Sequence, residues 1–481
     1  MKRDSFGRAQ DATVTQPISH DVLKEKYLKT GESGAEDVYR RVARSLASVE
    51  AEADRAKYEA LFLENLHAGA IGAGRIMSAA GTAIQATLIN CFVQPVGDCI
   101  QGVDDGGYPG IYEALREAAE TMRRGGGVGY DFSRIRPRGA EVKATASVAS
   151  GPCSYINVFD QSCSTVESAG ARRGAQMGVL RIDHPDVLDF ITAKRTPGRW
   201  NNFNVSVGVP DSFMQALSED QPWDLVHRAR PSAGLIAQGA FQRADGLWVY
   251  QTLAARELWD TVMKSAYDFA EPGILFLDHI NQDNNLRYCE SIAATNPCGE
   301  QPLPPYGCCD LGPIILTRFV RHPFGFNGVP AFDFTSFERA VGLQVRALDN
   351  VLDVTFWPLQ QQREESAAKR RIGVGFTGMG NALAMLCLRY DAPDGREMAA
   401  RIAARMRDAA YAASVALARE KGTFPKFEVE GYLGAGTFAS RLPAELQQAI
   451  RAHGIRNSHL LSIAPTGTVS LAFADNASNG I

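Results

Sequence analysis

A proline-rich segment past the middle of the chain gathers side chains that could carry out radical or redox chemistry. It reads Ala294-Thr-Asn-Pro-Cys-Gly-Glu-Gln-Pro-Leu-Pro-Pro-Tyr-Gly-Cys-Cys-Asp-Leu-Gly312, and its side chains include the amide of Asn296, the carboxylate of Glu300 and three thiols. Its prolines exclude a regular helix or an interior strand, because proline lacks the backbone N–H that both need. The segment is therefore predicted to be a rigid loop that is exposed or lines a cavity.

Cys298 and Glu300 lie two residues apart in this loop. In an extended stretch that spacing points both side chains to the same side. A carboxylate beside a thiol raises the pKa of the thiol, so the pair suits a thiolate nucleophile poorly. A thiol that donates a hydrogen atom does not need to ionise, so the arrangement favours radical or redox work over acyl transfer. The alternative, a proline-rich turn with incidental cysteines, stays open on composition alone.

Two glycine-containing segments could bind phosphates. Pro465-Thr-Gly-Thr-Val469 offers hydroxyls and backbone N–H groups, which bind an anion well if a helix starts there. Taken alone, it is more typical of an ordinary turn. Gly373-Val-Gly-Phe-Thr-Gly-Met-Gly380 contains the G-x-G-x-x-G pattern of a dinucleotide site, but only Ile372 precedes it as a strand residue. We interpret these glycines as close packing where a strand meets a helix.

The elements that must position these segments alternate between helix and strand. Residues 17–85 are predicted to be mostly helical, with Val38, Val42 and Leu46 on one face. Strands are predicted at 88–93, 203–209 and 273–277, and helices at 110–123 and 257–269. This alternation predicts an α/β fold with a parallel sheet or barrel.

Composition narrows the class of protein. The chain has 481 residues, 45% hydrophobic and 22% charged, with a net charge of -4, so it can bury a large core and lacks the basic surface that non-specific nucleic-acid binding needs. No apolar stretch suits a signal peptide or a membrane span, so we expect a cytoplasmic protein without nucleic-acid or membrane partners. The cysteines form no Cys-x-x-Cys pair, and no metal site is predicted. Five of them are expected to be small buried hydrophobes, namely Cys99, Cys153, Cys163, Cys289 and Cys387.

Taken together, Asn296-Pro-Cys-Gly-Glu300 and Pro304-Pro-Tyr-Gly-Cys-Cys-Asp-Leu-Gly312 resemble the finger-loop signature of ribonucleotide reductases. Pro297 resembles the adenosylcobalamin-dependent class of that family. Other stretches resemble the family in the same order, and the resemblance covers residues 16–481. They are Gln16-Pro-Ile-Ser, Lys26-Tyr-Leu-Lys-Thr-Gly-Glu, Asn90-Cys-Phe-Val-Gln-Pro-Val, Gly125 to Gly139, Gly170 to Gly178, Arg195 to Asn204 (loop 2) and Ala464-Pro-Thr-Gly-Thr-Val-Ser470.

The resemblance implies a role for each catalytic residue. Cys298 would carry the thiyl radical that removes the 3′ hydrogen of the ribose, Glu300 would take the 3′-hydroxyl proton, and Asn296 would hold the 2′ or 3′ hydroxyl. Cys91 and Cys309 would supply electrons as the 2′-hydroxyl leaves as water, and would end as a disulfide. The chain departs from the family at Cys308, where a small residue such as alanine is more common. That departure raises the question of which cysteine pairs with Cys91, and we expect Cys309.

The resemblance also implies two nucleotide sites. Substrate would contact Asn90, Gly127, Asn296, Glu300 and the phosphate loop Pro465, Thr466, Gly467 and Thr468. Effector nucleotides would bind at a dimer interface to Asp98, Arg136 and Lys143, of which two are cationic, as a triphosphate requires. Residues 195–204 would carry the influence of the effector to the active site.

The implied fold is an N-terminal helical region, residues 1–85, followed by a ten-stranded α/β barrel of two parallel five-stranded halves, residues 86–481, with the Cys298 loop at its centre. The implied reaction reduces ribonucleoside diphosphates to 2′-deoxyribonucleotides, with adenosylcobalamin as cofactor, dNTP or ATP effectors, a thioredoxin-like reductant and a homodimeric enzyme. Two alternatives stay open: the large subunit of a class with a separate radical-generating subunit, and a non-catalytic nucleotide-binding relative. We also expect no ATP-cone domain before Gln16, and a barrel that a separate C-terminal chain completes.

Overall fold

The computed structural model describes residues 16–142, 147–166 and 174–480, which fold as two compact units. Unit 1 is formed by residues 1–90 and 308–481, and unit 2 by residues 91–307. Unit 2 is therefore a continuous piece of chain inserted between two parts of unit 1.

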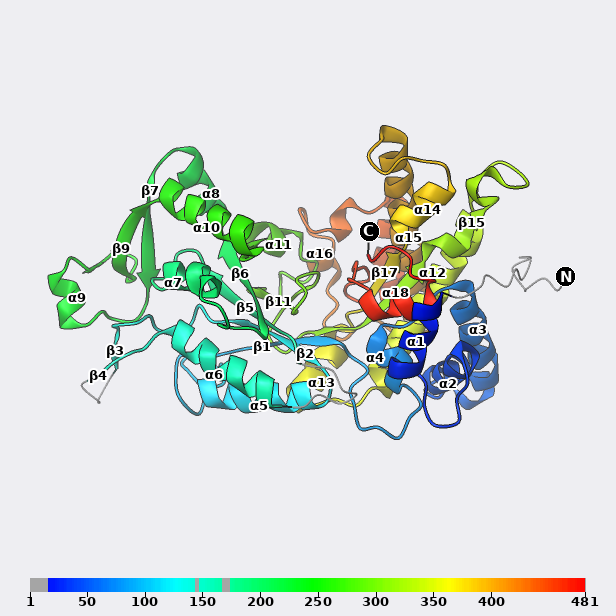
Figure 1. Ribbon diagram of the computed structural model, residues 1–481, viewed down its shortest axis with the longest axis horizontal. Coiled ribbons are helices and arrows are strands. Elements are labelled where there is room, and N and C mark those ends of the chain that lie inside the picture. Colours follow the sequence, from blue (N-terminus) through cyan, green and yellow to red (C-terminus); the bar gives the residue numbers. More distant parts are fainter. Residues whose placement is uncertain (1–15, 143–146, 167–173, 481) are drawn as a thin grey trace. The chain divides into compact units, whose positions relative to one another are not determined.

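Five strands of unit 2 form a parallel sheet in the order β10-β6-β5-β2-β1 (Figure 1). They are β1 (Cys91–Gln94), β2 (Gly127–Asp131), β5 (Gln176–Arg181), β6 (Phe203–Val209) and β10 (Gly273–Phe276). The helices between and after them are α5 (Ile111–Arg123), α6 (Pro152–Thr165), α7 (Val187–Thr192), α8 (Asp211–Ser218), α10 (Ala255–Phe269) and α11 (Leu277–Asp283). Parallel strands need such crossovers because the chain must return to the same end of the sheet. The predicted α/β class is confirmed.

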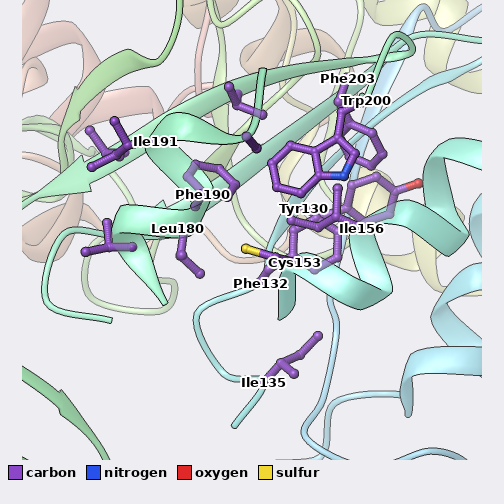
Figure 2. Packing of buried hydrophobic residues seen from close by; sticks show 14 of the residues in the cluster. Tyr130, Phe132, Ile135, Cys153, Ile156, Leu180, Phe190, Ile191, Trp200 and Phe203 are labelled. Carbon is purple, nitrogen blue, oxygen red and sulfur yellow. The ribbon is translucent and has the colours of Figure 1, made fainter. Parts of the chain in front are cut away.

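The core of unit 2 lies between this sheet and its helices. Tyr130 lies in β2 and Phe132 directly follows it, and their rings stack with centroids 5.3 Å apart. Figure 2 shows both rings together with Trp200 and Phe203, and all four side chains are buried. The Tyr130 hydroxyl donates to Oε1 of Gln176 at 2.8 Å, so this buried polar group has a partner. Burying each ring stabilises the fold by roughly 1.5–3 kcal/mol.

Short antiparallel elements complete unit 2. Strand β7 (Pro222–His227) pairs with β9 (Trp248–Ala254), which pairs with β8 (Phe241–Gln242), and helix α9 (Ala233–Ala237) lies among them in sequence. Strand β3 (Glu141–Val142) pairs with β4 (Ser147–Val148), and β11 (Ala294–Thr295) pairs with β12 (Pro302–Leu303). The β11–β12 hairpin carries the predicted active-site loop.

Strand β1 begins at Cys91 rather than at the predicted Leu88. The reason is that the N–H groups before Cys91 bond to side chains. The Leu88 N–H donates to Oγ1 of Thr355 at 2.8 Å, and the Ile89 N–H donates to Oγ1 of Thr87 at 3.1 Å. A backbone held this way cannot also join a sheet ladder.

The central helix of unit 1 is α12 (Phe334–Val354), which is buried on most of its surface and packs against α15 (Pro393–Lys421). The buried guanidinium of Arg346 in α12 forms two ion pairs. Its partners are Glu50 of the N-terminal region and Glu420 of α15, each at 2.6 Å. A buried guanidinium needs such partners because burial removes its water.

The N-terminal part of unit 1 is helical, as predicted. Its helices are α1 (Pro17–Lys26), α2 (Ala35–Ala47), α3 (Arg55–Ala68) and α4 (Gly74–Ala79). Helix α1 begins at Pro17 because proline is preorganised for the first helical position. Figure 1 shows α1 beside α18 (Gly467–Phe473), and the two helices are in contact.

The strands of unit 1 include a second parallel pair, β14 (Leu311–Ile315) with β17 (Gly373–Thr377). A side chain at Gly375 would place its Cβ 2.1 Å from the Ser462 carbonyl oxygen. The glycines of the predicted G-x-G pattern, Gly373 and Gly375, therefore belong to β17 and allow close packing against it. The remaining elements are α13 (Gln360–Lys369), α14 (Met379–Met385), α16 (Val429–Tyr432), α17 (Ala444–His453), β13 (Cys308–Cys309), β15 (Val320–Arg321) and β16 (Ala331–Phe332). None of the helices in the described ranges has the length and apolar character that a membrane crossing needs.

Candidate active site and effector site

The Cys298 loop is a tight turn between β11 and β12, which pair antiparallel through Ala294 with Leu303 and Thr295 with Pro302. The Gly299 N–H donates to the Asn296 carbonyl at 3.0 Å and closes the turn. Gly299 has a φ of +83°, in the left-handed region that glycine tolerates best. The predicted loop is confirmed, but around Cys298 it is a turn and not an extended stretch. The turn, rather than alternation along a strand, sets the positions of Cys298 and Glu300.

Asn296 organises this turn from a fully buried position. Its Nδ2 donates to Oε2 of Glu300 at 2.7 Å, while its Oδ1 accepts from the Gln301 N–H at 3.0 Å. One amide therefore fixes both the carboxylate and the backbone that carries it. The predicted residues Asn296, Cys298 and Glu300 are brought together by this arrangement.

Two glycines of β2 allow the loop to lie directly on the sheet. A Cβ at Gly129 would lie 1.8 Å from the Thr295 carbonyl oxygen, and one at Gly127 would lie 2.9 Å from Cγ of Pro297. On the neighbouring part of the sheet, Asn204 donates from Nδ2 to the Pro297 carbonyl at 2.7 Å. Gly127 is thus next to the residue that precedes Cys298, and loop 2, which ends at Asn204, is tied to the same place.

Cys91 opens β1 and pairs in register with Gly127. Burial, the nearby Cys91 thiol and the charge of Glu300 together raise the pKa of Cys298 to about 12, although the residue is exposed. Burial also raises the pKa of Glu300, against the hydrogen bond from Asn296, which lowers it. The Cys298 thiol is therefore protonated at neutral pH, as the sequence predicts.

The end of the loop is anchored to β1. The Tyr306 N–H donates to the Val93 carbonyl at 2.8 Å, and the Val93 N–H donates to the Gly307 carbonyl at 3.0 Å. The Tyr306 hydroxyl donates to Oε2 of Glu117 at 3.1 Å, and Nε2 of Gln94 donates to the same oxygen at 2.6 Å. The strand that starts at Cys91 and the loop that carries Cys298 are therefore joined through backbone and side chains.

Cys308 and Cys309 belong to unit 1, where both are buried in β13. Cys308 lies against Ser366 of α13, and burial together with the charge of Asp310 raises its pKa to about 12. Cys91 belongs to unit 2, so the pairing of Cys91 with Cys309 stays a prediction. Asn90, also in unit 1, accepts a hydrogen bond from the Arg75 N–H at 3.4 Å.

The predicted phosphate loop, Pro465 to Thr468, leads into α18, so a helix does start there. Its hydroxyls are held on two sides. Oγ1 of Thr466 lies 3.0 Å from Oγ1 of Thr377, and Oγ1 of Thr468 lies 2.7 Å from the hydroxyl of the buried Tyr27. The N-terminal helical region thus contributes directly to the setting of this loop.

The predicted effector residues Asp98 and Arg136 are brought together. The Arg136 N–H donates to Oδ1 of Asp98 at 2.8 Å, and the guanidinium Nη2 lies 3.2 Å from Oδ2 of Asp98. Nη1 of Arg136 also donates to the Glu141 carbonyl at 2.9 Å. Lys143 lies outside the described residues, as do residues 170–173 of the turn before loop 2.

Glu117 was not predicted from the sequence as a residue of the site, and neither were the contacts that Asn204 and Tyr306 make there. The two-residue spacing of Gly127 and Gly129 on one strand could have indicated a chain lying on that face. Of the cysteines expected to be buried, Cys153 and Cys163 are buried and Cys99 is half-buried, whereas Cys289 and Cys387 are exposed, so the expectation is wrong for those two.

Comparison with known proteins decides the family. A sequence profile described as "Ribonucleotide reductase, barrel domain" matches residues 89–481, and one described as "Ribonucleotide reductase, all-alpha domain" matches residues 14–85. The chain belongs to the ribonucleotide reductase family. The α/β barrel fold with a preceding helical region is therefore that of ribonucleotide reductases, as the resemblance implies.

Curated ribonucleotide reductases match most of the chain. A "Vitamin B12-dependent ribonucleoside-diphosphate reductase" of Mycobacterium tuberculosis (strain CDC 1551 / Oshkosh) is 36% identical over 462 residues, 94% of this chain and 59% of the relative. A protein of the same name from Thermoplasma acidophilum is 35% identical over 382 residues, 79% of this chain and 44% of the relative. The "Ribonucleoside-diphosphate reductase large chain" of Encephalitozoon cuniculi is 24% identical over 414 residues, 81% of this chain and 52% of the relative. The chain spans less than 60% of the length of each of these relatives.

Proposed function

We propose that this chain is the catalytic part of an adenosylcobalamin-dependent ribonucleoside-diphosphate reductase, which converts ribonucleoside diphosphates to 2′-deoxyribonucleoside diphosphates. The observation that carries the proposal is the Cys298 turn. It combines a thiol that stays protonated, on an exposed residue, with a carboxyl group of raised pKa that Asn296 holds at 2.7 Å. Such a thiol suits the exchange of hydrogen atoms.

The proposed reaction begins with this thiol. As a thiyl radical, Cys298 takes the hydrogen atom from C3′ of the ribose and re-forms its S–H bond, which leaves the unpaired electron on the sugar. The carboxylate of Glu300 accepts the proton of the 3′-hydroxyl. Its raised pKa brings the group closer to neutral pH, where a general base works best. Asn296 positions this carboxylate, and its amide suits a sugar hydroxyl as a further partner.

Cys91 and Cys309 are the proposed reductants. Their two thiols become one disulfide, and the two electrons and two protons released convert the C2′ hydroxyl into a C2′ hydrogen and water. The side chain of Cys308 supports Cys309 as the partner of Cys91. Cys308 lies against α13, and consecutive residues of a strand point to opposite sides, so Cys309 points away from that helix.

The cofactor proposal rests on two observations. Cys298 is an exposed residue, and the relatives that are 35–36% identical are named as vitamin B12-dependent. Adenosylcobalamin, when bound, supplies the one-electron oxidising equivalent that turns the Cys298 thiol into a thiyl. The chain's own contribution is to hold that thiol protonated and near Glu300.

Both alternatives are supported less well. Relatives named simply as large chains or subunits, without a reference to vitamin B12, are 24–25% identical, which favours the cobalamin-dependent class over one with a separate radical-generating subunit. A non-catalytic nucleotide-binding relative would have no need of the Asn296 and Glu300 contact beside a protonated thiol. The intact arrangement therefore favours an enzyme.

We further propose the partners that the resemblance implies. Substrate phosphates bind the loop Pro465 to Thr468, where a helix starts and hydroxyls gather. Effector dNTP or ATP binds at Asp98, Arg136 and Lys143 at the interface of a homodimer, and a thioredoxin-like protein reduces the disulfide. Residues 1–85 are the helical region and residues 86–481 the barrel of this enzyme, which works in the cytoplasm.

The test is single-turnover deoxynucleotide formation by the purified, dithiol-reduced protein supplied with adenosylcobalamin and a ribonucleoside diphosphate, with a ribonucleoside triphosphate in parallel. We expect product from the diphosphate, none from Cys298→Ser, because a hydroxyl cannot carry the hydrogen atom at this energy, and full product from Cys387→Ser, a control at another exposed cysteine. Product from Cys298→Ser contradicts the radical assignment. Equal product without adenosylcobalamin contradicts the cofactor.

A further inference from the structure

Two buried histidines of unit 2, His184 and His227, hold the backbone that leads to Arg136. His184 follows β5, His227 ends β7, and they are only 2% and 6% exposed. Their rings meet edge to face, with centroids 5.5 Å apart and planes at 71°. They are named the histidine pair below.

Both members of the histidine pair use their two ring nitrogens in the same way. Nδ1 of His184 accepts from the Asp186 N–H at 3.0 Å, and Nδ1 of His227 accepts from the Ala229 N–H at 2.9 Å. A neutral ring whose Nδ1 accepts carries its proton on Nε2. The two Nε2–H groups therefore donate to consecutive carbonyls, His227 to Arg134 at 3.2 Å and His184 to Ile135 at 3.0 Å.

The histidine pair has the charge state that its hydrogen bonds to the two carbonyls require. Burial is the largest cause that lowers the pKa of His184 to about 3 and of His227 to about 4. The charged groups that face them are Asp183 at His184, and Arg134, Arg136 and Arg228 at His227. Both rings stay neutral at physiological pH, so both keep the tautomer that holds the two carbonyls.

The backbone that the histidine pair holds leads directly into Arg136, the predicted effector-binding residue. After the carbonyls of Arg134 and Ile135, the Arg136 N–H donates to Asp98 at 2.8 Å, and the Arg138 N–H donates to both carboxylate oxygens of Asp186 at 3.2 and 3.0 Å. Asp186 is also the residue whose N–H bonds His184. The segment 134–138 is therefore fixed at four of its five residues by side chains from three other parts of unit 2.

We propose that His184 and His227 are positioning residues of the effector site: by holding the carbonyls of Arg134 and Ile135 they fix the backbone from which the Arg136 side chain reaches Asp98 and an incoming nucleotide. This inference rests on the proposed role of Asp98 and Arg136 in effector binding. An arginine on a fixed backbone binds phosphate without first ordering the chain, and ordering the backbone of one residue corresponds to about tenfold in a binding constant.

The experiment measures the dissociation constants of dATP, dGTP and dTTP for the purified protein. It compares glutamine with asparagine at each histidine. Glutamine places an amide N–H where Nε2 stood and keeps the donor to the carbonyl, whereas asparagine reaches only as far as Nδ1 and loses it. We expect His227→Asn and His184→Asn to weaken nucleotide binding about tenfold. His227→Gln and His184→Gln should stay within about threefold of the wild type, because the donor is retained.

Two further variants separate positioning from general stability. Val262→Ala removes buried volume from α10 of unit 2 and lowers stability without touching segment 134–138, and it should bind nucleotide as the wild type does. Arg136→Ala should lose binding. If Val262→Ala weakens binding as much as the asparagine variants, or if glutamine and asparagine behave alike, the positioning role is overturned. If Arg136→Ala binds normally, the proposed effector site itself fails, which is a distinct result.

Discussion

Replacing Gly129 with alanine should disable the active site while leaving the fold in place. The added Cβ would lie 1.8 Å from the Thr295 carbonyl oxygen, whereas carbon and oxygen normally approach to about 3.3 Å, so the loop that carries Cys298 must move by about 1.5 Å. A misplacement of about 1 Å can reduce an enzymatic rate about 100-fold, which corresponds to about 2.7 kcal/mol of transition-state stabilisation. We therefore expect deoxynucleotide formation to fall by about two orders of magnitude.

The assay measures single-turnover deoxynucleotide formation and thermal unfolding of the same preparations. Gly178→Ala is the matched control, because Gly178 lies on the adjacent strand β5 and its Cβ would meet Phe203 at 3.4 Å, an ordinary contact. Overpacking at Gly129 should destabilise the fold by only about 1–3 kcal/mol, so the protein should still unfold cooperatively. If the single-turnover rate of Gly129→Ala lies within threefold of that of Gly178→Ala, the packing of the Cys298 loop on β2 does not set the position of Cys298.

Three further predictions follow from the same contacts. With a pKa of about 12, Cys298 should react with iodoacetamide at pH 8 roughly 10³-fold more slowly than a free thiol of pKa about 8.5, and comparable rates at Cys298 and the exposed Cys387 would contradict this. Oxidised protein should contain a Cys91–Cys309 disulfide that survives Cys308→Ala; a peptide map with Cys91 bonded to Cys308 would refute the pairing. The folded pKa values of the histidine pair, about 3 and about 4, lie below the unfolded value of 6.5, so its stabilisation is present above pH 6.5 and lost as the pH falls. The free energy of unfolding in urea should therefore be about 4 kcal/mol lower at pH 5 than at pH 7.5 because of the histidine pair. A variant with glutamine at both positions that shows the same pH dependence would disprove this contribution.

The sequence by itself determined the chemistry of the loop and the class of the fold. A thiol two residues from a carboxylate, in a segment whose prolines exclude regular structure, was enough to predict a protonated thiol at Cys298. The alternation of apolar strands with helices predicted the parallel sheet, because local periodicity reflects which face of each element is buried. Glycines at Gly373 and Gly375 were correctly interpreted as packing residues, since too little strand precedes them for a dinucleotide turn.

Only the tertiary structure decided how that chemistry is positioned. The sequence predicted a loop, but the turn at Asn296 and the hydrogen bond of its amide to Glu300 appear only in the folded structure. The Cys298 loop packs on Gly129 and accepts a hydrogen bond from Asn204, and the histidine pair bonds the backbone of segment 134–138. All of these contacts join residues that are far apart along the chain. Such contacts leave no periodic trace in the sequence, because each depends on one atom meeting another after the sheet has formed.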